Sequence, residues 1–510
     1  MTAAAAPARR PNIVLMMADD MGFSDLGCYG GEIRTPRLDA LARGGLRFTH
    51  FYNTARCCPT RASLLTGLYP HQAGVPHMVD TGGDLNSRCV TIAQVMRLGG
   101  YRTAMAGKWH VTPVNESKDN WPLQRGFERF YGTIHGAGSF YDPVTLTDGN
   151  EPVRAAGKDY YYTDAIADHA ERYIGEFAGG PDPFFLYAAF TAPHWPMHAP
   201  ESEVAKYKGR YKGGWDALRA ERHKRMLALG VVDKRWPLTP RDETAPAWAD
   251  EKNKEWMERR MEVYAAMVDR MDQAVGRIVD KLKAAGQLDN TLILFLADNG
   301  GCAEELRGAG NALHVPKLTR DGRPVRFGNR PDVMPGKDDD YQSYGLAWAN
   351  ASNTPFRLYK HWVHEGGIAS PLIAHWPAAM AKNRGGLVDE PAHLVDIMAT
   401  CADLGGARYP ERYKGERILP MEGRTLGPAL RGEGPRPARA LYWEHEGNRA
   451  VREGDWKLVS KYPGEWELYN LREDRTELRN LAAAQPSRVR EMAGKWDAWA
   501  ARAGVKPWRR

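Results

Sequence analysis

Two apolar runs, each followed by oxygen-bearing side chains, constrain the fold of this chain most strongly. Residues 11–18 lead into Asp19-Asp20, and residues 291–296 lead into Asp298-Asn299. Short apolar runs of this kind indicate buried strands. Stretches with helical spacing lie elsewhere along the chain, at residues 35–44, 91–98, 162–177 and 254–285. This alternation predicts an α/β fold with helices on both faces of a sheet.

The two polar pairs are candidates for one metal site. In open α/β sheets, ligands bind beyond the carboxyl ends of the strands, where both pairs are expected. Alone, each pair could equally cap a strand end or lie in solvent. Together, three carboxylates and one amide suit a hard cation such as Ca²⁺ or Mg²⁺ better than zinc.

The C-terminal part has a different pattern. Residues 438–469 alternate short strand-like runs with turns, and residues 486–502 have helical spacing. We therefore expect a smaller antiparallel sheet with one helix after the main sheet. The length of 510 residues suggests two or three domains. We expect a catalytic α/β domain over residues 1–415 and an α+β subdomain over residues 416–510.

Charge and hydropathy argue against two classes of protein, those that bind nucleic acid and those that span a membrane. The net charge is +7, but Lys and Arg are scattered, which favours anionic substrates over nucleic acid. The apolar runs stay below 18 residues, so no membrane span is expected. The first residues do not resemble a signal peptide. The default location is therefore cytoplasmic, or periplasmic or secreted if a leader was removed.

The segment Cys57-Cys58-Pro59-Thr60-Arg61 has an unusual arrangement. Pro59 fits the first turn of a helix, and Arg61 can turn back toward the cysteines, which makes an anion site at a helix N-terminus. A strained disulfide between adjacent cysteines and a plain buried cysteine are alternatives. A phosphatase loop of the type Cys-x5-Arg is excluded, because Ser63 lies six residues after Cys57.

This segment carries a family resemblance. The run CCPTRASLLTG, followed by LYPH, resembles the signature of formylglycine-dependent sulfatases in the alkaline phosphatase superfamily. The resemblance implies a large mixed, mostly parallel sheet sandwiched by helices. It also implies that the formylglycine-generating enzyme oxidises Cys57 to formylglycine.

Other family positions have counterparts here. The resemblance implies calcium ligands, with Mg²⁺ or Mn²⁺ as lesser candidates, at Asp19, Asp20, Asp298 and Asn299. It implies that Arg61 and Lys108 stabilise the nucleophile and the sulfate oxygens. His110 is then the candidate base, and His194 and Lys360 bind sulfate and neutralise the leaving oxygen. Taken singly, Lys108 and Lys360 could be surface lysines and His194 a loop histidine.

The implied activity is hydrolysis of small-molecule or sugar sulfate esters. One hydroxyl of the formylglycine hydrate attacks sulfur, and the other then expels sulfate from the covalent intermediate. A phosphonate or phosphate monoester hydrolase of the same superfamily is the first alternative, and an inactive anion- or glycan-binding protein is the second. Four tryptophans could stack on an aryl or sugar ring or could equally lie in the core: Trp195, Trp215, Trp236 and Trp362.

Overall fold

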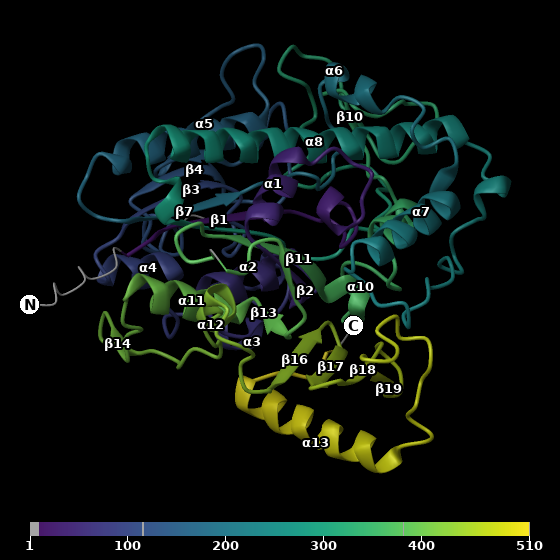
Figure 1. The fold of residues 1–510 in the computed structure, drawn as a ribbon. Coiled ribbons are helices and arrows are strands. Elements are labelled where there is room, and N and C mark those ends of the chain that lie inside the picture. Colours follow the sequence, from purple (N-terminus) through teal and green to yellow (C-terminus); the bar gives the residue numbers. More distant parts are fainter. Residues whose placement is uncertain (1–9, 115–116, 381, 509–510) are drawn as a thin grey trace, which may run out of the picture.

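A large mixed sheet crosses the centre of the protein, seen here in a computed structural model that describes residues 10–114, 117–380 and 382–508 (Figure 1). Its eleven strands run in the order β12-β2-β11-β8-β1-β7-β3-β4-β5-β6, and β13 also pairs with β2. They are β1 (Asn12–Ala18), β2 (Leu46–Tyr52), β3 (Arg102–Gly107), β4 (Arg129–Thr133), β5 (Leu146–Asp148), β6 (Glu151–Pro152), β7 (Phe184–Ala189), β8 (Thr291–Ala297), β11 (Ala369–His375), β12 (Gly386–Val388) and β13 (Ala392–His393).

The middle of this sheet is parallel. β1 pairs in parallel with both β7 and β8, and β3 pairs in parallel with β7 and β4. β11 runs antiparallel to β8 and to β2. The expected mixed, mostly parallel sheet is confirmed. Because β1, β3, β7 and β8 point the same way, the residues that follow them gather at one edge of the sheet.

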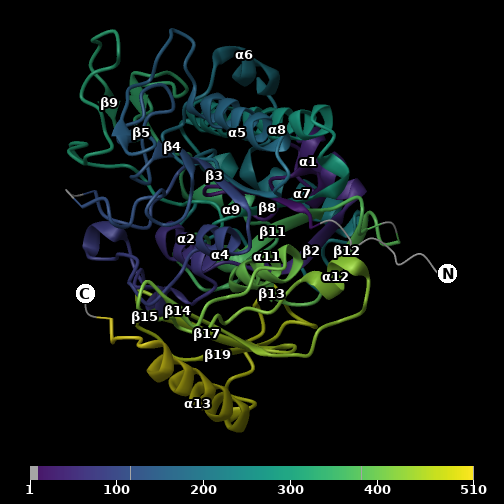
Figure 2. The ribbon, with the colours of Figure 1, turned by 90° about the vertical axis from the view of Figure 1, so that its left-hand side faces the viewer.

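Helices cover both faces of the sheet. α1 (Pro36–Gly44), α5 (Tyr162–Ala178) and α8 (Lys254–Ala284) lie on one face, and α2 (Cys57–Thr66), α4 (Ile92–Leu98) and α11 (Val395–Gly405) on the other (Figures 1 and 2). Val14 and Met16 of β1 pack in the first core, whereas Ile13 and Leu15 pack in the second. The strand alternates between the two layers, as a central strand buried on both faces must.

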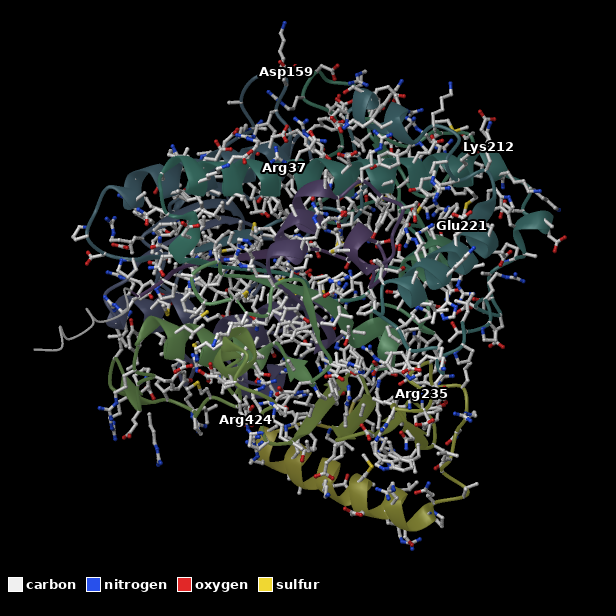
Figure 3. The ribbon with its side chains drawn as sticks, viewed as in Figure 1. Arg37, Asp159, Lys212, Glu221, Arg235 and Arg424 are labelled. Carbon is white, nitrogen blue, oxygen red and sulfur yellow. The ribbon has the colours of Figure 1, made fainter. Side chains whose placement is uncertain are left out.

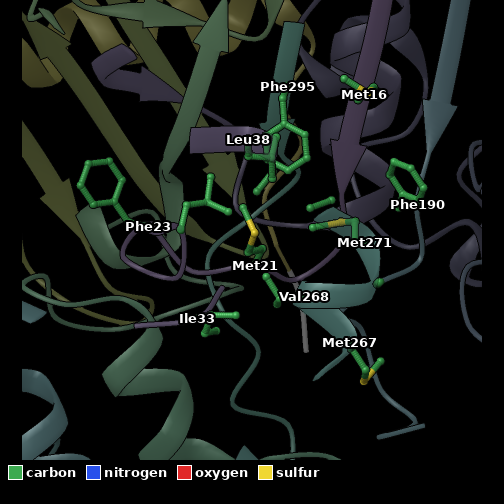
Figure 4. Close-up of a cluster of buried hydrophobic side chains, with 14 of the residues drawn as sticks. Met16, Met21, Phe23, Ile33, Leu38, Phe190, Met267, Val268, Met271 and Phe295 are labelled. Atoms are coloured by element: carbon green, nitrogen blue, oxygen red, sulfur yellow. The ribbon is translucent and has the colours of Figure 1, made fainter. Parts of the chain in front are cut away.

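Apolar side chains lie between these layers, and most charged side chains lie on the outside. Met16, Leu38 and Met271 lie within the core between β1, α1 and α8 (Figure 4). Arg37 follows Pro36 on α1 and carries its charge outward, where it pairs with Asp280 of α8 (Figure 3). Burial of the apolar faces is the dominant favourable term in holding these layers together.

The C-terminal sheet is separate from the main sheet. It contains four antiparallel strands, β16 (Ala440–His445), β17 (Asn448–Glu453), β18 (Trp456–Ser460) and β19 (Glu467–Asn470). Helix α13 (Pro486–Ala503) packs on it through Trp496 and Trp499 (Figure 1). The expected small sheet with one helix is confirmed. None of the helices in the described part of the chain has the length and apolarity needed to cross a membrane.

Candidate active site

The two polar pairs predicted at the strand ends come together. Ala18 and Ala297 are partners in the parallel pair of β1 and β8, so the residues that follow them leave the sheet side by side. The backbone N–H of Asp20 donates to Asp298 Oδ1 at 3.0 Å, and Asn299 Nδ2 donates to Asp20 Oδ1 at 2.6 Å. Asp20 holds a φ of 63°, a left-handed conformation that is uncommon for a non-glycine residue. Such outliers concentrate at functional sites.

These four residues fit a bound cation. All of them are at most 1% exposed. Among the described residues, Asp19 Oδ1 and Asn299 Oδ1 are buried with no hydrogen-bond partner, which costs free energy unless an ion satisfies them. Burial and the neighbouring Asp19 raise the pKa of Asp298 well above its usual range. Oxygen donors crowded in this way are the ligand set of Ca²⁺ or Mg²⁺.

Three buried cationic side chains face the carboxylates. Lys108, just after β3, donates to Asp19 Oδ2 at 2.6 Å. Lys360 donates to Asp20 Oδ2 at 2.9 Å, and Arg61 of α2 donates to Asp298 Oδ2 at 3.1 Å. Burial alone would raise the pKa of Asp20, but the charge of Lys360 holds this pKa below its usual value. The two lysines are therefore part of the site and are not surface residues.

Cys57 begins helix α2 beside these groups. It follows Arg56, which is extended, and Pro59 lies in the first turn as the sequence predicted. Cys57 is 2% exposed, and both Cys57 and Cys58 are free thiols, so the alternative of an adjacent disulfide is wrong. The hydrogen bond from Cys58 outweighs burial and, with Lys108, holds the pKa of the Cys57 thiol well below its usual range. Residue 57 thus lies where anionic oxygen or sulfur is stabilised.

The two predicted histidines also lie in the site, and both are neutral. His110 Nε2 is 3.2 Å from Cys58 Sγ, and burial lowers the pKa of His110 to about 3. His194 has Nδ1 2.6 Å from the Trp195 carbonyl and Nε2 3.3 Å from Asp20 Oδ2. Burial lowers the pKa of His194 to about 4. The contact with a carbonyl assigns the proton of His194 to Nδ1, since only an N–H can donate there.

Comparison with known proteins places this geometry in a family. The profile described as "Sulfatase" matches residues 11–407, which is more than half of the chain. This chain belongs to the sulfatase family. A second profile, described as "N-sulphoglucosamine sulphohydrolase, C-terminal", matches residues 356–494. The sulfatase resemblance given by the cysteine motif is confirmed, and the enzyme is a sulfatase.

Individual relatives agree with this assignment. The sulfatase is 32% identical to an uncharacterized sulfatase of Schizosaccharomyces pombe, over 98% of this chain and 95% of that protein. It is 33% identical to an arylsulfatase of Klebsiella aerogenes, over 83% of this chain and 92% of that enzyme.

Solved structures show the same fold. A protein crystallised with its substrate D-glucosamine-2-N,6-O-disulfate aligns with a TM-score of 0.66 at 20% identity, over 98% of this chain and 99% of that one. The phosphonate monoester hydrolase of Agrobacterium radiobacter aligns with a TM-score of 0.60 at 22% identity, over 97% and 96% of the two chains.

Sequence reasoning missed the role of Glu304 at the edge of the site in this sulfatase. Glu304 accepts from Arg56 at 2.8 Å and from Trp195 Nε1 at 2.9 Å. Burial opposes its ionisation, but Lys360 and Arg56 hold the pKa of Glu304 far below its usual value. Glu304 therefore fixes two groups at the edge of the site. The available signal was its place in the same segment that follows β8, five residues after Asn299.

The four candidate tryptophans have different surroundings. Trp195 stacks on His194, with ring centroids 4.4 Å apart. Trp215 is fully buried and packs against Trp248 and Trp348, so of the two alternatives it is a core tryptophan. Trp236 packs beside His50 on β2, and Trp362 lies under Lys461 of the C-terminal part.

Proposed function

We propose that this sulfatase hydrolyses sulfate monoesters with a nucleophile formed from Cys57, through a covalent sulfate intermediate on residue 57. The observation that supports this best is the surroundings of Cys57. A thiol at the N-terminus of a buried helix lies among Lys108, Lys360 and His110. Two buried lysine charges serve a nucleophile that acquires a sulfuryl group, whereas a structural cysteine does not require them.

We propose that Cys57 is matured to formylglycine by the formylglycine-generating enzyme. The hydrate of this aldehyde supplies two hydroxyls, one to attack sulfur and one to expel sulfate afterwards. Residue 57 is 2% exposed in the folded chain. Maturation therefore acts on the chain before this segment is buried.

The surrounding residues have separable tasks in this proposal. Arg61 and Lys108 hold the nucleophile and the sulfate oxygens, because both are fully buried cations beside residue 57. His110 accepts the proton of the second hydroxyl, since its ring is neutral. Lys360 and His194 bind sulfate and neutralise the leaving oxygen, His194 after its Nε2 takes up a proton from solvent as the sulfate ester binds, since its resting proton lies on Nδ1. Lys360 keeps its charge, since Asp20 outweighs burial and raises the pKa of Lys360 well above its usual value.

We propose Ca²⁺ as the cation, with Mg²⁺ or Mn²⁺ less suited. Asp19, Asp20, Asp298 and Asn299 would hold it, and their donor atoms are all oxygen. A bound divalent cation supplies positive charge to compensate negative oxygen in the site. The partly unpaired oxygens of Asp19 and Asn299 support this assignment.

The proposed substrates are small-molecule or sugar sulfate esters. The arylsulfatase relative favours the first class, and the structural relative with its sulfated glucosamine favours the second. Matched aryl sulfate and aryl phosphate esters test the reaction class. We expect the higher kcat/KM with sulfate. A higher value with phosphate or phosphonate would assign the chain to the alternative, and no turnover of either by matured protein would favour an inactive anion-binding protein.

A further inference from the structure

A cluster of metal-ligating side chains lies outside the active site, where the C-terminal sheet meets the catalytic part. It contains His361, His445 and Glu446, and one ligand atom from each lies within 4.8 Å of the other two. We propose that these three residues bind a divalent transition-metal ion of the zinc type. This second cluster differs from the active site, where the strand-end donors are oxygens.

The contacts within the cluster place a carboxylate between two imidazoles. His361 Nδ1 is 3.4 Å from Glu446 Oε2, and His445 Nε2 is 3.8 Å from Glu446 Oε1. The two rings have centroids 5.3 Å apart. Two imidazole nitrogens with one carboxylate oxygen form a ligand set that zinc accepts, and they leave a fourth position for water.

The surroundings of His445 are independent evidence that it binds a metal ion. It is 0% exposed, and neither ring nitrogen has a hydrogen-bond partner of normal geometry among the described residues. The Pro76 carbonyl acts on the ring, and Glu446 Oε1 lies 3.8 Å from Nε2. Burying an imidazole without partners is costly, and a metal ion would satisfy it.

The backbone holds the other two ligands in strained conformations. Glu446 and Gly447 form the two-residue turn between β16 and β17, with φ angles of 49° and 83°. Turns of this kind favour Asn-Gly or Asp-Gly, because both positions require positive φ. A glutamate is a poor choice there for conformation alone. His361 has a φ of 91°, which is also strained for a non-glycine residue.

The charges around the cluster do not oppose a cation. The permanent positive charge of Arg56 acts on His445, but Glu304 pairs with Arg56 at 2.8 Å. Glu444, two residues before Glu446, carries a further carboxylate and lies 2.7 Å from His71 Nε2. Asn448 Nδ2 lies 3.3 Å from His361 Nε2.

A metal ion here would join the C-terminal hairpin to the active site. His361 directly follows Lys360, and its N–H donates to the Ala55 carbonyl at 2.8 Å. Ala55 lies two residues before Cys57. The ion would therefore fasten the β16–β17 turn to the segment that carries Lys360, and its main effect would be on stability.

Zinc titration of the full-length, calcium-saturated protein tests this proposal. Cys57→Ala is used as the background, because Cys57, Cys58 and His110 form another possible zinc group in unmatured chains. We expect one zinc ion per chain by calorimetry. At a hundredfold excess over Kd, we expect Tm to rise by about 2–3 °C.

Variants assign the zinc ion to its ligands. His445→Ala and Glu446→Gln should each weaken zinc binding at least about tenfold and remove the Tm shift. Glu446 lies in a turn, so its variant remains informative if His445→Ala does not fold. His223→Gln, which alters a half-buried histidine on α7 (Gly214–Ala228), should bind as the background does. No zinc binding, or equal binding by Glu446→Gln and the background, would overturn the proposal.

Discussion

Replacement of Lys360 by methionine separates its catalytic task from its structural one. Lys360 Nζ lies 2.9 Å from both oxygens of Asp20, and its side chain is 2% exposed. Removing one partner of a buried pair costs about 3–5 kcal/mol. For a chain of this length, that corresponds to a loss in Tm of about 3–5 °C in calcium-free protein. Calcium bound at Asp20 would replace the missing charge, so the loss should shrink when calcium is added.

The same variant should lose activity. A preorganised charge aimed at the reacting oxygens is worth about 10²–10³ in rate, so kcat/KM for an aryl sulfate should fall by that factor. Steady-state kinetics of matured, calcium-loaded protein measures it, with thermal unfolding measured beside it. Lys457→Met is the matched control, because Lys457 is equally buried and pairs with Glu365 at 2.9 Å and Glu477 at 2.8 Å.

The control should be destabilised to a similar degree, but without dependence on calcium and with kcat/KM close to that of the unsubstituted enzyme. If Lys360→Met keeps kcat/KM within about tenfold, Lys360 does not act on the transferred group. If its loss of stability is the same with and without calcium, the assignment of Asp20 as a metal ligand is refuted.

Three further changes test other parts of the account. Cys57→Ser retains one hydroxyl and lacks the second, which would expel sulfate. We therefore expect at most one equivalent of alcohol per enzyme, and mass spectrometry should show a lasting sulfate adduct on residue 57. Sustained turnover would contradict elimination by a second hydroxyl. Asp298→Ala removes a metal ligand and the partner of Arg61, so we expect weaker calcium binding by calorimetry and loss of most activity; zinc held by His and Cys at this position would refute the oxygen site. His198 is fully buried, and burial lowers its pKa to about 4. Between pH 6.5 and 4, His198 is therefore protonated in the unfolded chain but neutral in the folded chain. Stability is therefore lost as pH falls through this range, and urea unfolding should show about 2 kcal/mol more loss between pH 7.5 and 5 in the unsubstituted protein than in His198→Gln; equal losses would show that His198 titrates normally.

The parts of the site that follow regular structure were predictable. Asp19 and Asp298 each follow an apolar strand, and parallel strands bring their ends to one edge. Arg61 lies one turn after Cys57 on the same helix, so local geometry was sufficient to place it. The alternation of strands and helices likewise predicted two helical layers over the sheet.

The remaining features depend on contacts between distant segments. Glu304 meets Arg56 across 248 positions of the sequence, and no local pattern marks that pair. His361 meets Glu446 only because the C-terminal sheet packs against the segment after Lys360. Trp215 is of a residue type that can stack on substrates, but packing against other tryptophans buries it. Tertiary packing determines the positions of these residues, and the periodicity of the sequence carries no information about such packing.

Peptide mass spectrometry of residue 57, combined with an activity assay on the same preparations, tests the central claim most directly. Preparations made with and without the formylglycine-generating enzyme would be compared on an aryl sulfate. We expect turnover to rise in proportion to the fraction of residue 57 present as formylglycine, and to be absent where this residue remains cysteine. Full activity in protein whose Cys57 is unmodified would contradict the account.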